Sequence, residues 1–116
     1  MSPPPDGNFS ILQKLTAAYL LWHNFLNQLP RLARYSLGTK IDSLFAETLE
    51  LVLSARYAGK DSKLALINKA IVKFDALKFF LQILWQSKAL DNKKYLCLSE
   101  ALSEIGKIMG GWKKLF

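Results

Sequence analysis

The sequence predicts an all-α protein, an antiparallel up-down four-helix bundle, and three observations lead to this prediction. Apolar residues recur in alternating steps of three and four in four separate segments, a spacing that aligns side chains along one side of a helix. Short connections join the segments, so consecutive helices should run antiparallel. No segment alternates apolar and polar residues with a period of two, and β-branched residues are too sparse for a sheet.

The first two helices are predicted on either side of Pro30, because proline lacks the backbone N–H that a helix interior needs. Glycine is a common C-terminal stop, so Gly59 should end the second helix. The apolar stripe of the first helix consists of Leu12, Leu15, Tyr19, Trp22, Leu26 and Leu29. The stripe of the second consists of Leu37, Ile41, Leu44, Thr48, Leu51 and Ala55.

The last two helices are predicted to begin with a capping oxygen. Asp61 or Ser62 can cap the third helix and Asp91 or Asn92 the fourth, because a short oxygen-bearing side chain accepts a hydrogen bond from an unpaired backbone N–H. The stripe of the third helix consists of Leu64, Ile67, Ile71, Phe74, Leu81 and Trp85. The stripe of the fourth consists of Tyr95, Leu98, Leu102, Ile105, Met109 and Trp112.

The length of 116 residues fits one domain. Three prolines forbid a helix near the start, so we expect residues 1–8 to be a disordered tail and residues 9–116 the four-helix domain. The start lacks the features of a signal peptide, and the longest uncharged apolar run, residues 15–30, is shorter than the roughly 20 apolar residues that span a bilayer. One cysteine suits a reducing compartment, so we expect a cytoplasmic protein without membrane contact.

The helices carry more apolar residues than one bundle should need. Because monomers rarely leave large apolar patches in water, this surplus predicts a homo-oligomer. The additional apolar residues are Ala18, Leu21 and Phe25 in the first helix and Leu77, Phe80 and Leu84 in the third.

The charge balance favours a polyanionic partner. Sixteen Lys and Arg stand against nine Asp and Glu, and the net charge is +7. Thirteen of the sixteen are lysines, which contact phosphates as point charges and suit binding without sequence preference. The residues predicted to contact RNA or DNA are Arg31, Arg34, Lys40, Lys73, Lys93, Lys94, Lys107 and Lys113.

No combination of residues predicts an enzyme, a cofactor or a metal site. His23 is the single histidine and lacks the Glu three residues earlier that a di-iron bundle requires. Cys97 belongs to a different helix and is expected to be a small buried residue. Glu100 and Glu104 lie four residues apart, a spacing that could pair two carboxylates, but they are expected to be surface charges.

Two structural motifs are predicted in the last two helices. Lys78 falls between Phe74 and Leu81 in the third stripe, where it would need a carboxylate partner such as Glu104. Glycines four residues apart would let another backbone approach the last helix. The residues of this second motif are Gly106, Gly110, Gly111 and Trp112, the last of which should close the apolar stripe.

Four stretches of the chain, residues 29–41, 72–85, 89–95 and 99–113, resemble one family. This is the accessory variability determinant of diversity-generating retroelements, grouped with four-helix-bundle proteins encoded in ribosomal RNA intervening sequences. The most specific part is Glu-Ile-Gly-basic-x-x-Gly-Gly-Trp, which is residues 104–112 here. The family usually has Arg at position 107, where this chain has Lys.

The resemblance implies a non-catalytic, homopentameric barrel of basic four-helix protomers. It also implies binding of template RNA or cDNA and association with the retroelement's reverse transcriptase during mutagenic copying. The alternative is a bundle of the intervening-sequence type, with a structural or RNA-binding role and no polymerase partner.

Overall fold

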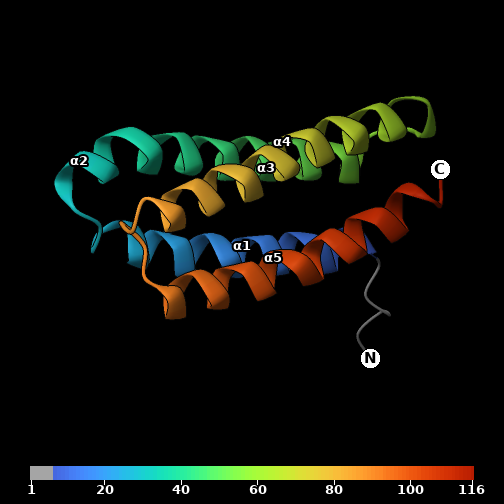
Figure 1. Cartoon of the computed structure of the whole chain (residues 1–116). Helices are drawn as coiled ribbons and strands as arrows, with labels where there is room; N and C mark the ends of the chain where they lie inside the picture. Colours follow the sequence, from blue (N-terminus) through green and yellow to red (C-terminus); the bar gives the residue numbers. More distant parts are fainter. Residues whose placement is uncertain (1–6) are drawn as a thin grey trace.

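The computed structural model describes residues 7–116, and these residues form an all-α bundle without a strand (Figure 1). Residues 1–6 of the expected tail lie outside the described residues, and helix α1 already begins at Gly7. The four-helix prediction is confirmed by four long helices, with a short helix and a π-helical turn between the first two. The elements are α1 (Gly7–Leu26), α2 (Arg31–Ala33), η1 (Arg34–Gly38), α3 (Thr39–Tyr57), α4 (Lys60–Gln86) and α5 (Asn92–Lys113).

The long helices pack in the order of the chain, and the last closes against the first. α3 contacts both α1 and α4, and α5 contacts both α4 and α1. Figure 1 shows the pair α3 and α4 lying over the pair α1 and α5, with consecutive long helices running in opposite directions. The α1–α3 and α4–α5 connections therefore share one end of the bundle, and the α3–α4 turn shares the other end with the end of α5.

The predicted stripe of α5 is confirmed, apart from Tyr95, which lies half-buried against the core. In α1 the buried stripe is rotated, because the helix packs against both α3 and α5. Ile11 and Ala18 are buried there, whereas Leu12 and Tyr19 only pack against the edge of the core. The buried residues of α5 are Leu98, Leu102, Ile105, Met109 and Trp112.

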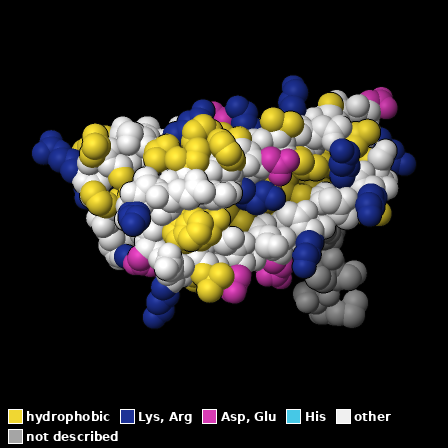
Figure 2. All heavy atoms as spheres, viewed as in Figure 1, with side chains coloured by type: hydrophobic (Ala, Val, Ile, Leu, Met, Phe, Trp, Pro, Cys, Tyr) yellow, Lys and Arg dark blue, Asp and Glu magenta, His cyan; other side chains and the backbone are white. Residues whose placement is uncertain are grey.

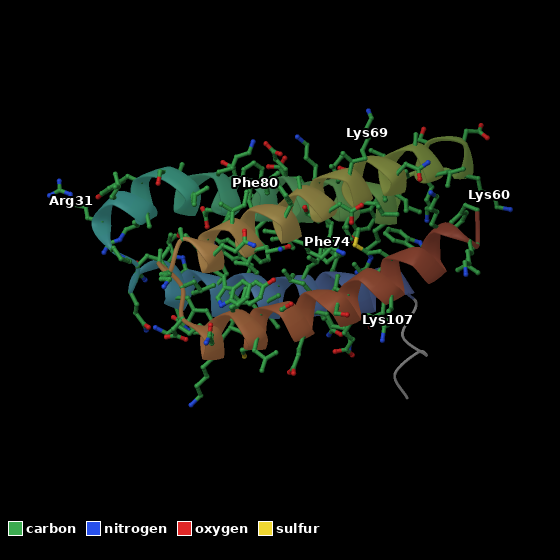
Figure 3. The ribbon with its side chains drawn as sticks, viewed as in Figure 1. Arg31, Lys60, Lys69, Phe74, Phe80 and Lys107 are labelled. Atoms are coloured by element: carbon green, nitrogen blue, oxygen red, sulfur yellow. The ribbon has the colours of Figure 1, made fainter. Side chains whose placement is uncertain are left out.

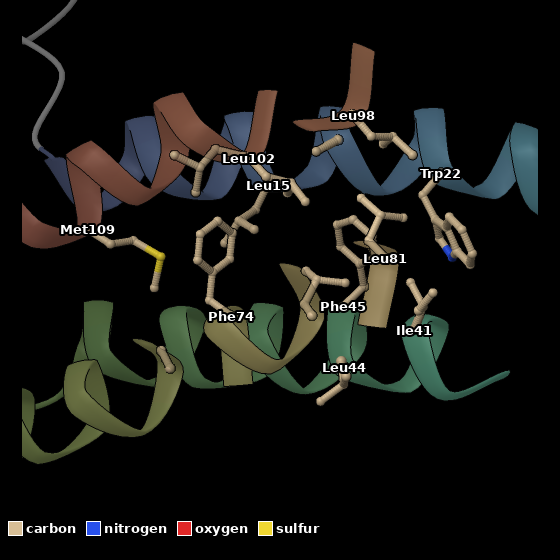
Figure 4. Close-up of a cluster of buried hydrophobic side chains, with 14 of the residues drawn as sticks. Leu15, Trp22, Ile41, Leu44, Phe45, Phe74, Leu81, Leu98, Leu102 and Met109 are labelled. Carbon is tan, nitrogen blue, oxygen red and sulfur yellow. The ribbon is translucent and has the colours of Figure 1, made fainter. Parts of the chain in front are cut away.

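Large side chains from all four long helices meet in the centre (Figure 4). Phe45 of α3, which the predicted stripe omitted, is fully buried and lies against two aromatic rings of α1. Its ring centroid is 6.2 Å from that of Trp22 and 5.6 Å from that of Tyr19. Trp22 Nε1 also donates to Asp42 Oδ1 at 3.2 Å, so α1 and α3 are joined by both apolar and polar contacts.

Helix ends depart from the prediction in two places. α1 ends at Leu26, and Pro30 instead precedes α2 as its N-cap residue. Gly59 is the N-cap residue of α4, which begins at Lys60 without a side-chain cap, so capping by Asp61 or Ser62 was wrong. Asp91 does cap α5 as predicted, because its side chain accepts a hydrogen bond from the backbone N–H of Lys94 at 2.8 Å.

The apolar surplus is largely used inside the single chain, which corrects the sequence argument for an oligomer. Ala18, Leu77 and Leu84 are buried, and the other three residues of that set lie half-buried against the core. Because Leu77 and Leu84 of α4 pack inside the bundle, no second copy of the chain is needed to cover them. Other large apolar residues are exposed, among them Leu53, Val72 and Phe79. The homo-oligomer stays a prediction.

Candidate nucleic-acid interface

Basic side chains lie at both ends of the bundle and along the visible face, with acidic side chains between them (Figure 2). The first end, here called the elbow end, consists of residues 29–38 and 87–94. The second, the turn end, consists of residues 56–63 and 113–116. Figure 3 shows Arg31 at the elbow end and Lys60 at the turn end. The predicted contact residues are therefore spread over the whole molecule.

The elbow is held by side chains that bind its own backbone. Ser36 Oγ donates to the carbonyl of Leu32 at 2.8 Å, and Thr39 Oγ1 donates to that of Arg34 at 3.2 Å. Gly38 is buried, and a Cβ there would lie 2.8 Å from Leu26 Cδ1 and 3.1 Å from the carbonyl oxygen of Ala33. The π-helical turn therefore depends on a residue without a side chain.

Arg34 belongs to this internal scaffold, so its predicted contact with nucleic acid finds no support in the geometry. Its Nη2 donates to the carbonyl of Leu29 at 3.1 Å and to that of Asn27 at 3.5 Å. Its Nε is buried without a hydrogen-bond partner. The guanidinium therefore satisfies carbonyls that follow α1, where no intrahelical donor exists.

Three other predicted lysines already have partners in the chain. Lys73 Nζ lies 3.0 Å from Glu47 Oε2 and so joins α4 to α3. Lys94 Nζ lies 3.7 Å from Asp91 Oδ2, within α5 and its cap. Lys40 Nζ lies 5.7 Å from the centre of the Phe80 ring. The two ion pairs are largely exposed and contribute little to stability, so a phosphate can compete for Lys73 and Lys94.

Lys78 has a carboxylate partner, as predicted, but this partner is Asp75 and not Glu104. The buried stripe of α4 passes through Leu77, so Lys78 lies half-exposed beside the core and its Nζ is 3.6 Å from Asp75 Oδ1 of the same helix. Glu104 instead accepts a hydrogen bond from Lys14 of α1. This bond, aided by the charges of Lys14 and Lys107, lowers the pKa of Glu104.

The glycines of α5 differ in their surroundings. A Cβ on Gly106 would lie 3.4 Å from Phe74 Cε2, so this glycine faces an α4 side chain and not a second backbone. Gly110 and Gly111 have open space around them. Gly106 and Gly110 help to line a hollow of about 300 Å³ between α4 and α5, which Lys107 also borders. Trp112 is buried and closes the stripe, as predicted.

The turn end combines exposed cations with exposed aromatic rings. Lys60, Lys113 and Lys114 form no ion pair with any carboxylate that the structure describes. Tyr57 is 76% exposed, with the guanidinium carbon of Arg56 5.6 Å from its ring centre. Lys113 is the one residue of the predicted contact set that lies at this end. The sequence signal that could have identified this end is an Arg-Tyr pair at the end of a helix, followed by a turn that contains lysines.

The two residues considered for chemistry show no catalytic arrangement. Cys97 is exposed, so the expectation of a buried thiol was wrong, since one position away from Leu98 already turns the side chain about 100° around the helix. His23 is exposed and lies beside the Tyr19 ring. Within residues 7–116, no group of three His, Cys, Asp or Glu side chains could hold a metal ion. None of the helices described is both long and apolar enough to span a membrane.

Comparisons with known proteins agree with this fold. A structure from Bacteroides thetaiotaomicron VPI-5482, a protein with unknown function from the S23 ribosomal protein family, superposes with a TM-score of 0.85. The match covers 94% of this chain and 99% of that chain at 14% sequence identity, so it shows the fold alone. No curated protein matches the chain in sequence. A family model described as bAvd-like matches residues 9–116, and the chain therefore belongs to the bAvd-like family.

Proposed function

We propose that the protein is a non-catalytic accessory subunit of a diversity-generating retroelement. In this role it binds template RNA or cDNA through its basic surface and associates with the reverse transcriptase in the cytoplasm. The observation that carries the proposal is the match of the bAvd-like family model to residues 9–116. The net charge of +7 and the exposed lysines on α4, α5 and both ends support it.

The binding mechanism is electrostatic. Lysines contact backbone phosphates without reading bases, and each phosphate that is neutralised releases a counter-ion. Binding should therefore weaken steeply as salt increases, by about 0.7 to 0.9 in log–log slope for each contact. Arg34 is left out of the proposed contact set because its Nη2 already donates to the carbonyl of Leu29. The contact residues that we propose are Arg31, Lys40, Lys73, Lys93, Lys94, Lys107 and Lys113.

A homo-oligomer, the pentamer that the resemblance implies, would multiply these contacts. Support comes from large apolar side chains exposed on α3 and α4, where Leu53 is 48%, Val72 66% and Phe79 59% exposed. Where such residues form one contiguous patch, the patch is typical of a surface that a second chain covers. Light scattering on the purified protein tests this part, and a single copy at micromolar concentration would contradict it.

The decisive experiment is a pull-down of the tagged chain from its native host. We expect recovery of a reverse transcriptase together with its template RNA. A matched variant, Lys73→Glu with Lys107→Glu, should recover less RNA because two proposed phosphate contacts become repulsive. Recovery of neither polymerase nor nucleic acid with the unaltered chain would refute the proposed function.

The second candidate is a bundle of the intervening-sequence type with a structural or RNA-binding role and no polymerase partner. The fold shared with the S23 family protein favours it, because the superposition covers nearly all of both chains. The same pull-down separates the candidates, since recovery of ribosomal material without a polymerase would favour the second.

A further inference from the structure

The turn end has a feature that simple phosphate binding does not require: an aromatic ring held in solvent beside a cation. Tyr57 is the last residue of α3, and 76% of it is exposed. A second ring, that of Phe116, lies at the same end, with Lys63 Nζ 5.4 Å from its centre. Phe116 is 45% exposed. Two flat apolar surfaces are thus presented next to positive charge.

The surrounding charge is almost all positive. Residues 56–63 and 113–116 contain five basic side chains and one acidic side chain, Asp61. Lys60 and Lys63 lie one helical turn apart at the start of α4, and Lys113 and Lys114 follow at the end of α5. A phosphate bound by Lys63 would lie beside the Phe116 ring, because the Lys63 Nζ is 5.4 Å from the centre of that ring.

The elbow end offers a close comparison. It also has five basic residues and one acidic residue in residues 29–38 and 87–94, and Tyr35 is 68% exposed with Arg31 6.0 Å from its ring centre. Two of its cations are engaged, however, because Arg34 binds the backbone that follows α1 and Lys94 pairs with Asp91. At the turn end, no ion pair with a described carboxylate engages Lys60, Lys63, Lys113 or Lys114.

We infer that the turn end is a single-strand stacking site: unpaired bases of RNA or cDNA stack on Tyr57 and Phe116 while Lys60, Lys63 and Lys113 contact the adjoining phosphates. Stacking needs unpaired bases, because the faces of bases in a duplex are already covered by their neighbours. Exposed aromatic rings in a basic groove are the usual means of holding single strands without sequence preference. The inference rests on the proposed function, because it names the form of nucleic acid that this surface accepts.

The test measures binding of a fluorescent oligouridine of about 12 nucleotides, a length within the usual site size, and of a hairpin duplex with the same label, over a series of salt concentrations. Tyr57→Ala should weaken single-strand binding by about fivefold or more, the loss expected when one stacked base is removed. Because a ring carries no charge, the salt slope should not change. Tyr57→Phe should restore affinity, and duplex binding should be unaffected.

Two controls keep the result specific. Tyr35→Ala removes an exposed ring beside an arginine at the other end, and should leave single-strand binding unchanged. Lys60→Ala should instead reduce the salt slope by about 0.7 on single strands, as expected for one lost phosphate contact. Phe116→Ala, at a residue outside every helix, gives a second test of stacking that does not depend on the end of α3.

The outcomes are separable. Equal single-strand affinity of Tyr57→Ala, Phe116→Ala and the unaltered protein would overturn the stacking site, as would equal losses for Tyr57→Ala and Tyr35→Ala or an equal loss on the duplex. Each of these results would leave the accessory function standing. Failure of the unaltered protein to bind either oligonucleotide at the lowest salt would refute nucleic-acid binding itself, and the stacking site with it.

Discussion

The two ends of the bundle carry the same number of basic and acidic residues and use them differently. At the elbow end, Arg34 and Ser36, together with Thr39 at the start of α3, bind backbone carbonyls and hold the π-helical turn in place. At the turn end, α3 and α4 are separated by Ala58 and Gly59 alone, and no side chain caps α4. Composition does not determine whether a cation is structural or available. This depends instead on whether backbone carbonyls without a hydrogen-bond donor lie near the cation.

The largest effect expected from this comparison is on the free energy of unfolding, when the same substitution, glycine to serine, is made at each end. Gly38→Ser should lower the free energy of unfolding by about 1–3 kcal/mol, because its Cβ would press on Leu26 and on the carbonyl of Ala33. Gly59→Ser should raise it by a few tenths of a kcal/mol or more, since Gly59 has open space around it and serine caps helices well. Urea denaturation measures both. Effects of the same sign would contradict the comparison.

Removing one cation from each end should have contrasting consequences. Arg34→Met should destabilise the fold by about 1 kcal/mol, because the carbonyl of Leu29 loses its donor, and should change polyanion binding little. Lys60→Met should leave unfolding unchanged, because Lys60 is exposed, and should weaken binding at low salt. Denaturation and anisotropy on both variants give the comparison. If Arg34→Met instead kept full stability and lost polyanion binding, Arg34 would belong to the nucleic-acid interface.

The elbow end also contains a strained residue that the turn end lacks. Lys88 has a φ of 69° in the α4–α5 connection, a conformation that costs a residue with a Cβ about 1 kcal/mol. Lys88→Gly should therefore raise the free energy of unfolding by about 0.5–1 kcal/mol. Lys88→Ala retains the Cβ and should give no such gain. Equal melting temperatures of Lys88→Gly and Lys88→Ala would show that the positive φ of residue 88 does not lower the stability of the fold.

The smallest effect lies between the two ends, where Lys14 of α1 pairs with Glu104 of α5. The hydrogen bond from Lys14 and the charges of Lys14 and Lys107 lower the pKa of Glu104 in the folded chain. Its contribution to stability is therefore fully present above the ordinary pKa of about 4.5 and is lost as pH falls through the lowered value. Thermal melts over a pH series measure this contribution. In Glu104→Gln the small loss of stability in the acid range should disappear, whereas in Gln13→Glu, a substitution at an exposed residue of α1, it should remain.

The fold was largely predictable, and α5 shows why. Its stripe steps by three and four without interruption, and the bundle buries every residue of that stripe except Tyr95. In α4 the same spacing was ambiguous, because the helix is apolar on adjoining positions and packs against both α3 and α5. For this reason the predicted stripe included Lys78, whereas the structure buries Leu77 instead. A sequence pattern defines a face, and the neighbouring helices define how far that face is turned.

The candidate interface was less predictable, since basic residues on every helix look alike in a sequence. The role of Arg34 depends on carbonyls that follow α1, and their position follows from the π-helical turn, which has no signature in residues 34–38. Lys73 was proposed for phosphate contact, and its neighbour Glu47 lies on another helix. Tyr57 was not proposed at all, because only the structure shows that this ring stays outside the core.

Cys97 gives the chain a convenient chemical handle. It is the single cysteine, and its thiol lies on the outside of α5. A maleimide dye would therefore attach at one defined place in the otherwise unaltered protein. Energy transfer between identical dyes, followed as labelled chains are diluted with unlabelled ones, would then report how many copies gather and whether added RNA changes that number.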